Sequence, residues 1–449
     1  DGVTSHSSKV TLTTYPELLV RGSNVSNNGT AWDNDADAVI GVAVDMDNGA
    51  MYFAINNTWI NSGVPTSGSA KTGAVATDLL TVNDGHHYVA AQGFNGNDNA
   101  GMYANFGQQA FAYTPPSGYK TLSTKNLPKT VPSIVKPKRH FDVLTWTGNA
   151  SNGNVITGLE FKPDFIWAKC RSNSHDNQII DSIRGTTKYA SSNRNDTLTA
   201  SDRITSINND GFTLGSDGRL NENSATNVAW CWKAGGSSNT FNVDGKGYTT
   251  AAAAGITDGS TALTGASVNT EAGFSMITYT GTGSATTVGH GLGAKPDWIL
   301  FRNRNDEGHG WNVYHSSIGA TKNLQLQTNA SVATASNKFN NTEPTSTVIT
   351  VNTAADTNQS GQNMIAYCWT AIPGYSKFGT YTGNGNTNGS YVYLGFRPAF
   401  VLFKSTSNSE NWQLKDYKRN GYNDQNHTIF ANNENVEYTT AEMDFLSNG

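Results

Sequence analysis

Apolar side chains recur in strand-like runs at three places in the second part of the chain, each time after the same proline-containing motif. Phe161 to Trp167 reads Phe-Lys-Pro-Asp-Phe-Ile-Trp, Ala294 to Leu300 reads Ala-Lys-Pro-Asp-Trp-Ile-Leu, and Phe396 to Leu402 reads Phe-Arg-Pro-Ala-Phe-Val-Leu. Short apolar runs of this kind are typical of β-strands. A proline at the first residue of a strand is tolerated because it need not donate to the ladder. We therefore predict a strand after each proline.

The similarity between these three segments extends in both directions. An aromatic-Thr-Gly turn stands 17 residues before each proline, at Trp146, Tyr279 and Tyr381. Downstream, equivalent positions are held by Asn177, Trp311 and Trp412, then by Asp181, His315 and Asp416, and then by Gly185, Gly319 and Gly421. Two copies end alike, in Val228-Ala229-Trp230-Cys231-Trp232 and Ile365-Ala366-Tyr367-Cys368-Trp369. Self-similarity at this level predicts tandem modules of one fold.

Linker composition and the repeats divide the chain into six segments. We predict a β-sandwich at 1–127, a Pro/Lys linker at 128–140, repeat 1 at 141–236, an Ala/Gly/Thr-rich insertion at 237–272, repeat 2 at 273–373 and repeat 3 at 374–449. The insertion has no counterpart between repeats 2 and 3, and it fits a loop or a strand that packs against a partner chain. Repeat 3 stops before the Cys-Trp segment, so we expect it to be truncated and the chain to be part of a longer polypeptide.

The first 127 residues show β-hairpin signals of their own. Val39–Asp45 and Met51–Ile55 alternate as strands around a turn with the Asn48-Gly49 signal. Two further strands are predicted at Tyr88–Ala91 and Met102–Gly107. The predicted fold class is therefore all-β and multidomain: a sandwich followed by tandem sandwich-like modules.

Composition narrows the functional classes. Charged residues make up 14% of the chain and the net charge is −5, which argues against a nucleic-acid partner, because phosphate binding needs clustered Lys and Arg. No apolar run approaches 18 residues, so no membrane insertion is predicted. Cys170, Cys231 and Cys368 are expected to be buried small hydrophobes rather than metal ligands or disulfide partners.

Candidate binding residues lie in the first segment. Asp33, Asp35 and Asp37 alternate in a loop that could hold calcium, but position six is Ala38 and no Glu follows at position twelve, so a solvated acidic loop fits better. Trp32 and Trp59 flank the hairpin, and loop aromatics offer flat faces on which sugars stack. The ligand-binding candidates are thus Trp32, Asp33, Asp35, Asp37 and Trp59. Trp311 and Trp412, being repeat-equivalent, are expected in the core.

No established catalytic or metal-binding pattern appears in the sequence. Metal-site histidine or cysteine spacings are missing, as are a Gly-x-Ser-x-Gly elbow and a phosphate-binding loop. Lys162 with Asp164 and Lys295 with Asp297 are interpreted as exposed charges at a strand entrance. We expect no enzymatic activity, no metal and no cofactor, although two close carboxylates of a glycosidase would leave no trace in a sequence.

Two family resemblances complete the sequence analysis. Val-Ile-Gly-Val-Ala-Val-Asp at 39–45, the following Asn-Gly, Tyr52-Phe53 and Asn-Phe-Gly at 105–107 resemble a SPRY domain, a concanavalin-like sandwich generally used for binding. The repeated aromatic-Thr-Gly, Lys-Pro-Asp-aromatic and Cys-Trp segments look like uncharacterised repeat modules of tailed-phage virion proteins, known best from marine phages.

The second resemblance implies a location and a role. It suggests a structural virion protein, a tail fibre or related appendage, on the outside of the tail or capsid, which binds a host-surface glycan or protein. By the same resemblance we expect a homo-oligomer, a trimer, in contact with other virion proteins. A capsid decoration or connector protein without a receptor, and a polysaccharide-degrading tailspike, are the alternatives.

Overall fold

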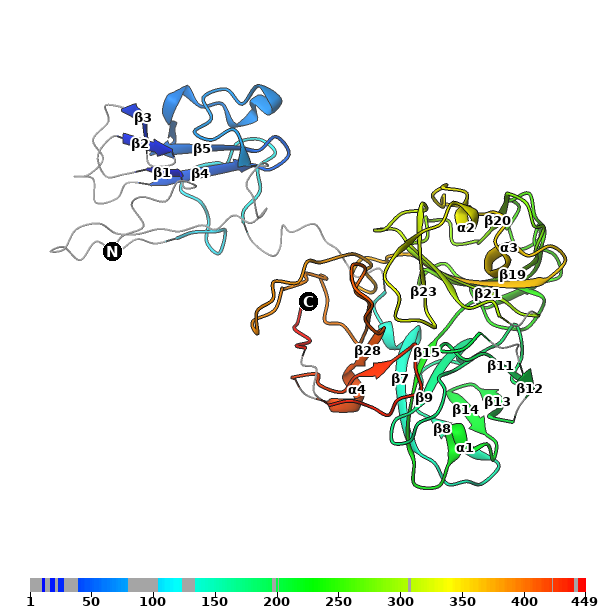
Figure 1. The fold of residues 1–449 in the computed structure, drawn as a ribbon. Helices are drawn as coiled ribbons and strands as arrows, with labels where there is room; N and C mark the ends of the chain where they lie inside the picture. Colours follow the sequence, from blue (N-terminus) through cyan, green and yellow to red (C-terminus); the bar gives the residue numbers. More distant parts are fainter. Residues whose placement is uncertain are drawn as a thin grey trace. The chain divides into compact units, whose positions relative to one another are not determined.

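The computed structural model describes the strands Val10–Leu12 (β1), Glu17–Val20 (β2) and Ser23–Asn27 (β3), and residues 39–79, 104–122, 134–195, 199–200, 202–305, 308–421, 423–439 and 443–449. Strands dominate the described residues, and the α-helices among them are four residues long (Figure 1). The prediction of an all-β, multidomain protein is confirmed. The chain divides into two compact units, residues 1–129 and 130–449. No helix of the described residues is long and apolar enough to cross a membrane.

Unit 1 contains two small sheets in its described part. One has the order β1-β2-β3, and the other joins Ile40–Asp45 (β4), Ala50–Ile55 (β5) and Thr58–Trp59 (β6). The predicted hairpin is present, with Ile40 opposite Ile55 and Asp45 opposite Ala50. Two 3-10 helices follow at Ile60–Ser62 (η1) and Pro65–Ala70 (η2). The strand predicted at Met102–Gly107 is wrong for its described part, because Ala104–Gly107 forms no strand and its four residues are exposed. The strand predicted at 88–91 lies outside the described residues.

Repeat 1 is built from two sheets that face each other. The 3-10 helix Pro137–Arg139 (η4) leads into a four-stranded sheet of order β10-β9-β15-β7, with strands Gln178–Asp181 (β10), Phe165–Cys170 (β9), Thr226–Trp232 (β15) and Phe141–Thr147 (β7). A three-stranded sheet is formed by Ile204–Asn208 (β13), Gly211–Leu214 (β14) and Asn154–Thr157 (β8). Lys188–Tyr189 (β11), Thr199–Ala200 (β12) and the helix Gly218–Asn221 (α1) complete the repeat. Apolar side chains of both sheets, Ile166 and Phe212 among them, form one core.

Repeat 2 follows the same plan within a nine-stranded sheet of order β17-β16-β18-β19-β26-β21-β22-β23-β24. Its strands are Phe274–Thr280 (β19), Trp298–Asn303 (β21), Asn312–His315 (β22), Lys322–Gln325 (β23), Ala333–Thr334 (β24) and Asn363–Trp369 (β26). Thr286–Gly289 (β20) and Val348–Val351 (β25) pair as the facing sheet, and the helices are Ser336–Phe339 (α2) and Ala355–Asn358 (α3).

The insertion at 237–272 is an ordered part of that sheet. It supplies Phe241–Val243 (β16), Lys246–Tyr248 (β17) and Leu263–Asn269 (β18). β18 pairs with β19 over its length, and β16 runs parallel to β18. The expectation of a loop is therefore corrected: the strands of the insertion pair within their own chain, where the ladder satisfies their backbone groups.

Repeat 3 contains a smaller sheet than the other two. Phe400–Phe403 (β27), Gln413–Asp416 (β28) and Ile429–Phe430 (β29) form it, with the helix Tyr417–Asn420 (α4) after β28. Residues 377–399 form no strand or helix, and Tyr381 is 55% exposed. Its counterparts Trp146 and Tyr279 are buried. β9 and β21 are buried at every residue, whereas all four residues of β27 are half-buried.

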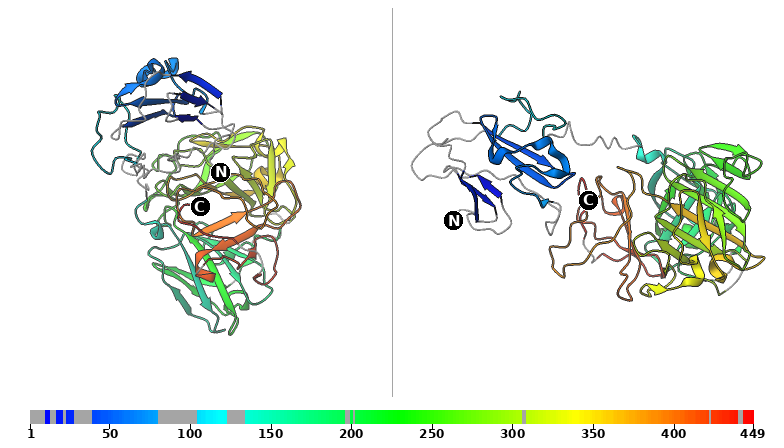
Figure 2. Two further views of the ribbon diagram at one scale, coloured as in Figure 1. Left: turned by 90° about the vertical axis from the view of Figure 1, so that its left-hand side faces the viewer. Right: turned by 90° about the horizontal axis from the view of Figure 1, so that it is seen from above.

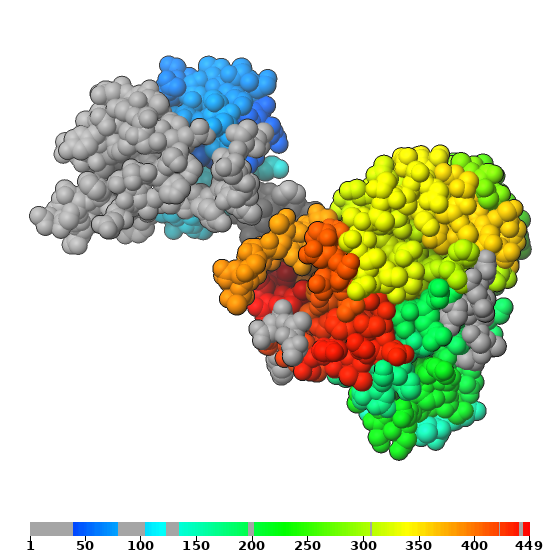
Figure 3. Space-filling view, in the orientation of Figure 1, coloured from blue at the N-terminus to red at the C-terminus, as the bar shows by residue number. Residues whose placement is uncertain are grey.

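All three repeats contribute to one central hydrophobic core. Trp230 of repeat 1, Tyr367 of repeat 2 and Trp412 of repeat 3 belong to it. Ring contacts cross between repeats, as with Phe165 and Tyr367 at 4.9 Å and Trp232 and Phe400 at 5.4 Å. The ribbon and space-filling views show the three repeats, coloured green, yellow and orange to red, side by side within unit 2 (Figures 2 and 3).

The Cys-Trp strands show why the sequence repeats as it does. β15 and β26 lie in the middle of their sheets, and both faces are covered. Trp230 and Tyr367 point to the shared core, while Cys231 and Cys368 point to the core of their own repeat. All three cysteines are free and buried, as predicted. Large aromatic and small side chains alternate because the two faces leave different amounts of space.

The Lys-Pro-Asp motif begins a strand as predicted, but one part of its interpretation is wrong. Lys162 and Lys295 are exposed, whereas Asp164 is 2% exposed. One oxygen of Asp164 accepts hydrogen bonds from the backbone N–H groups of Ala234 at 2.8 Å and Gly236 at 3.2 Å. Asp297 does the same for Ala371 at 2.8 Å. The aspartate thus fixes the chain that leaves the Cys-Trp strand, and burial raises the pKa of Asp164.

Candidate functional site

The binding residues predicted from the sequence are only partly described by the structure. Trp32, Asp33, Asp35 and Asp37 lie outside the described residues. Trp59 is half-buried, and its ring meets that of Tyr52 edge-on at 6.5 Å. It packs against the small core of Ala43, Ala50 and Tyr52. Trp59 is therefore partly used in packing, and part of the side chain stays accessible.

A buried hydrogen bond from an aromatic side chain to an aspartate joins repeat 2 to repeat 1, and an equivalent one joins repeat 1 to repeat 3. The hydroxyl of Tyr367 donates to Oδ2 of Asp181 at 2.7 Å, and the indole N–H of Trp230 donates to Oδ2 of Asp416 at 2.9 Å. Each aspartate also pairs with the arginine three residues later, Arg184 or Arg419, and all four charged side chains are at most 1% exposed. Burial raises the pKa of Tyr367 well above 10, so its hydroxyl remains a donor.

A second set of hydrogen bonds runs between neighbouring repeats in a closed circle. The indole N–H of Trp311 donates to the carbonyl of Ser191 at 2.7 Å, and that of Trp412 to the carbonyl of Gln325 at 3.0 Å. The amide of Asn177 donates to the carbonyl of Phe430 at 3.0 Å. The three donors are repeat-equivalent, so the contacts run from repeat 2 to 1, from 3 to 2 and from 1 to 3. Trp311 and Trp412 are in the core, as predicted.

The contact between repeats 3 and 2 has a different composition. His315 and Ile318 stand where the other repeats have Asp and Arg. The His315 ring packs against Phe378 of repeat 3, with 6.4 Å between ring centroids, and burial lowers the pKa of His315. An apolar contact therefore replaces the buried ion pair at this interface.

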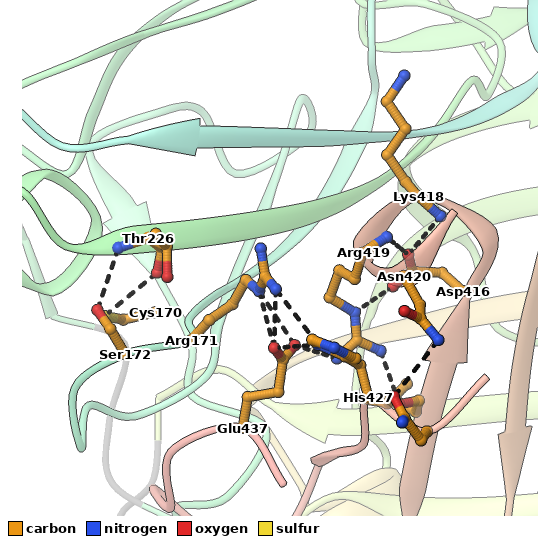
Figure 4. Close-up of polar contacts among 12 residues, drawn as sticks. Cys170, Arg171, Ser172, Thr226, Asp416, Lys418, Arg419, Asn420, His427 and Glu437 are labelled. Atoms are coloured by element: carbon orange, nitrogen blue, oxygen red, sulfur yellow. Dashed lines mark hydrogen bonds and ion pairs between the residues drawn. The ribbon is translucent and has the colours of Figure 1, made fainter. Parts of the chain in front are cut away.

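Glu437 is the centre of a charged cluster that joins repeats 1 and 3 (Figure 4). Its carboxylate accepts from Arg171 at 2.8 Å, from Arg419 at 2.8 Å and contacts Nδ1 of His427 at 2.6 Å. Burial by itself raises the pKa of Glu437, but the hydrogen bond from Arg171 and the positive charges of Arg419 and Arg171 lower it to about 2. With its oxygens occupied, this carboxylate is suited to holding two repeats together and not to proton transfer.

A polar cavity of about 430 Å³ lies mainly in repeat 2. Its wall includes α2, the first residues of α3 and the end of β23, and Asn195 of repeat 1 completes it. Asp356 lines the cavity and is 6% exposed. Oδ2 of Asp356 accepts from Nζ of Lys338 at 2.6 Å and from Nδ2 of Asn312 at 2.9 Å, whereas Oδ1 of Asp356 and Oδ1 of Asn312 have no hydrogen-bond partner.

Sequence reasoning missed this cavity, because its residues come from separated segments and match no motif. A buried carboxylate oxygen without a partner, on a residue that lines a cavity, is characteristic of a site that receives a hydrogen-bond donor. Among the described residues that line the cavity, Asp356 is the one carboxylate. The described part of the chain also contains no group of three or more His, Cys, Asp or Glu side chains that could hold a metal ion.

The strands and the shared core define an all-β protein of tandem repeats. Residues 136–449 match the family model described as "Domain of unknown function (DUF7483)", which covers more than half of the chain, and the chain belongs to this family. No curated protein and no solved structure was found to be similar to it.

Proposed function

We propose that this protein is a structural component of a tailed-phage virion, a tail fibre or related appendage that binds a host-surface glycan or protein. The observation that carries the proposal is the closed circle of buried contacts between the three repeats. A protein that bears load at the particle surface needs modules that do not separate, and leaving a buried hydrogen-bond partner unsatisfied costs about 1–3 kcal/mol.

The virion assignment rests on the resemblance of the repeated motifs to phage modules. The adhesive part rests on the polar cavity and on the SPRY-like resemblance of the first segment. Weak sites gain strength when several copies act together, because each bound copy raises the effective concentration of the next. An assembly of several chains, a trimer by resemblance, belongs to the proposal, and the proposed role requires no covalent chemistry.

Cryo-electron microscopy of the intact particle tests this function. We expect density for the chain on the tail exterior, with the opening of the repeat 2 cavity facing solvent. Density flat against the capsid or sealed between subunits would support a decoration or connector protein instead. Absence of the chain from purified particles, checked by mass spectrometry, would refute the virion role altogether.

A further inference from the structure

The cavity beside Asp356 in repeat 2 can be compared with the equivalent region of repeat 1, where side chains fill the space. Strand register aligns Gln178 with Asn312, since each lies opposite the fourth residue of β9 or β21. Arg203 corresponds to Lys338, because their carbonyls accept from the equivalent backbone groups of Gly215 and Asn352.

In repeat 1 the side chains at these positions satisfy one another. The guanidinium of Arg203 donates to Gln178 and, at 3.2 Å, to Asp217, and it stacks on the ring of Tyr189 at 3.2 Å. Asp217 in turn accepts from the backbone N–H of Arg219 and so caps α1. A large planar group with several donors therefore fills this region of repeat 1.

Repeat 2 has smaller side chains at the same positions. Lys338 replaces the guanidinium, Asn312 is one methylene shorter than Gln178, and Ala354 stands where repeat 1 has Asp217. The helix α3 consequently begins without a side-chain cap. The smaller side chains leave the cavity open beside Lys338 and Ala354. The oxygen of Asn312 loses the donor that Arg203 supplies to Gln178 in repeat 1, and Oδ1 of Asp356, which lines the cavity, has no partner either.

We propose that the cavity binds a neutral saccharide, one of whose hydroxyl groups donates to the unpartnered Oδ1 of Asp356. Nζ of Lys338 lies 2.6 Å from Oδ2 of Asp356 and balances its charge. Because the pair has no net charge, it favours neither a cationic nor an anionic ligand. Hydroxyls both donate and accept, which suits a cavity lined by one carboxylate and by the side-chain amides of Gln325, Gln327 and Asn337. A volume of about 430 Å³ lies within the range of small-molecule sites.

The inference rests on the proposed adhesive function and names its ligand class. The experiment uses the full chain on an array of neutral and charged glycans, followed by calorimetric titration with the strongest neutral saccharide. The double variant K338R/A354D rebuilds the repeat 1 arrangement inside repeat 2. It also caps α3, so we expect it to fold at least as stably as the wild type.

We expect K338R/A354D to lose saccharide affinity at least tenfold, and Asp356→Asn to weaken it similarly. Arg203→Lys, the reverse exchange at the equivalent position of repeat 1, is the matched control and should leave affinity unchanged. Thermal unfolding of each variant verifies that it is folded.

Three results would overturn the inference: no neutral glycan bound, binding of charged glycans alone, or unchanged affinity in folded K338R/A354D. If affinity is unchanged in folded K338R/A354D but the chain lies on the particle surface, the proposed function stands and only this binding site is ruled out. If K338R/A354D abolishes saccharide binding but the chain is absent from purified particles, the binding site is supported and the virion role is refuted.

Discussion

Replacing Glu437 with glutamine removes the charge that holds repeats 1 and 3 together while keeping the shape of the side chain. The pKa of Glu437 is about 2 in the folded protein, against 4.5 ordinarily, and the side chain is 9% exposed. At ~1.4 kcal/mol per pH unit, this difference corresponds to about 3 kcal/mol of folding stability at neutral pH.

The pH dependence of this contribution has a definite sign. A carboxylate whose folded pKa is depressed stabilises the protein above its unfolded pKa, and the stabilisation is lost as the pH falls through the folded value. We therefore expect Glu437→Gln to lower the free energy of unfolding by about 3 kcal/mol at pH 7, and the gap from wild type to close between about pH 5 and pH 2.

Urea unfolding followed by tryptophan fluorescence measures the gap, since all tryptophans except Trp32 and Trp59 lie in residues 130–449. Glu410→Gln is the matched control, because Glu410 is exposed and should change stability by less than about 0.5 kcal/mol. A gap of the same size at pH 7 and pH 3 would show that the charge of Glu437 does not act as described.

Two further predictions concern the buried groups between and within the repeats. Tyr367→Phe should cost about 1–3 kcal/mol in urea unfolding, because Asp181 loses a buried donor, and a cost below ~0.3 kcal/mol would contradict this contact. The thiols of Cys170, Cys231 and Cys368 should not react with a disulfide reagent in the folded protein and should all react in denaturant. The reason is that all three are buried, and burial raises the pKa of Cys368 to about 12. Labelling of any of these thiols in the native state would refute this prediction.

The repeated strands could be predicted from sequence because their determinants are local. The proline that opens β9 and β21, the apolar run after it and the aromatic-Cys-Trp alternation all lie within a few neighbouring residues. The glycines at 185, 319 and 421 have φ of 80°, 75° and 79°, a conformation that other residues avoid. Such features mark an element without reference to distant partners.

The errors arose where distant residues decide the environment. The local motif predicts an exposed Asp164, yet Asp164 is buried because its partners Ala234 and Gly236 stand about 70 residues away in sequence. Tyr381 carries the same local motif as Trp146 but is exposed, because no described strand pairs with the segment around it. The residues that line the cavity beside Asp356 come from separate segments, from Asn195 to Asp356, so no local pattern marks it.

The circle of contacts between repeats has a consequence for how such a protein can change. In a symmetric homotrimer every interface has the same residues, because a mutation in the one gene appears in all three chains. Here the repeats are linked in one polypeptide, and each interface varies by itself. His315 and Ile318 stand at one interface where the other two have buried Asp and Arg pairs, and Lys338 beside an open cavity stands where repeat 1 has Arg203. Because the repeats are joined in one chain, one copy can differ from the others at a single interface without the same change appearing at the remaining two.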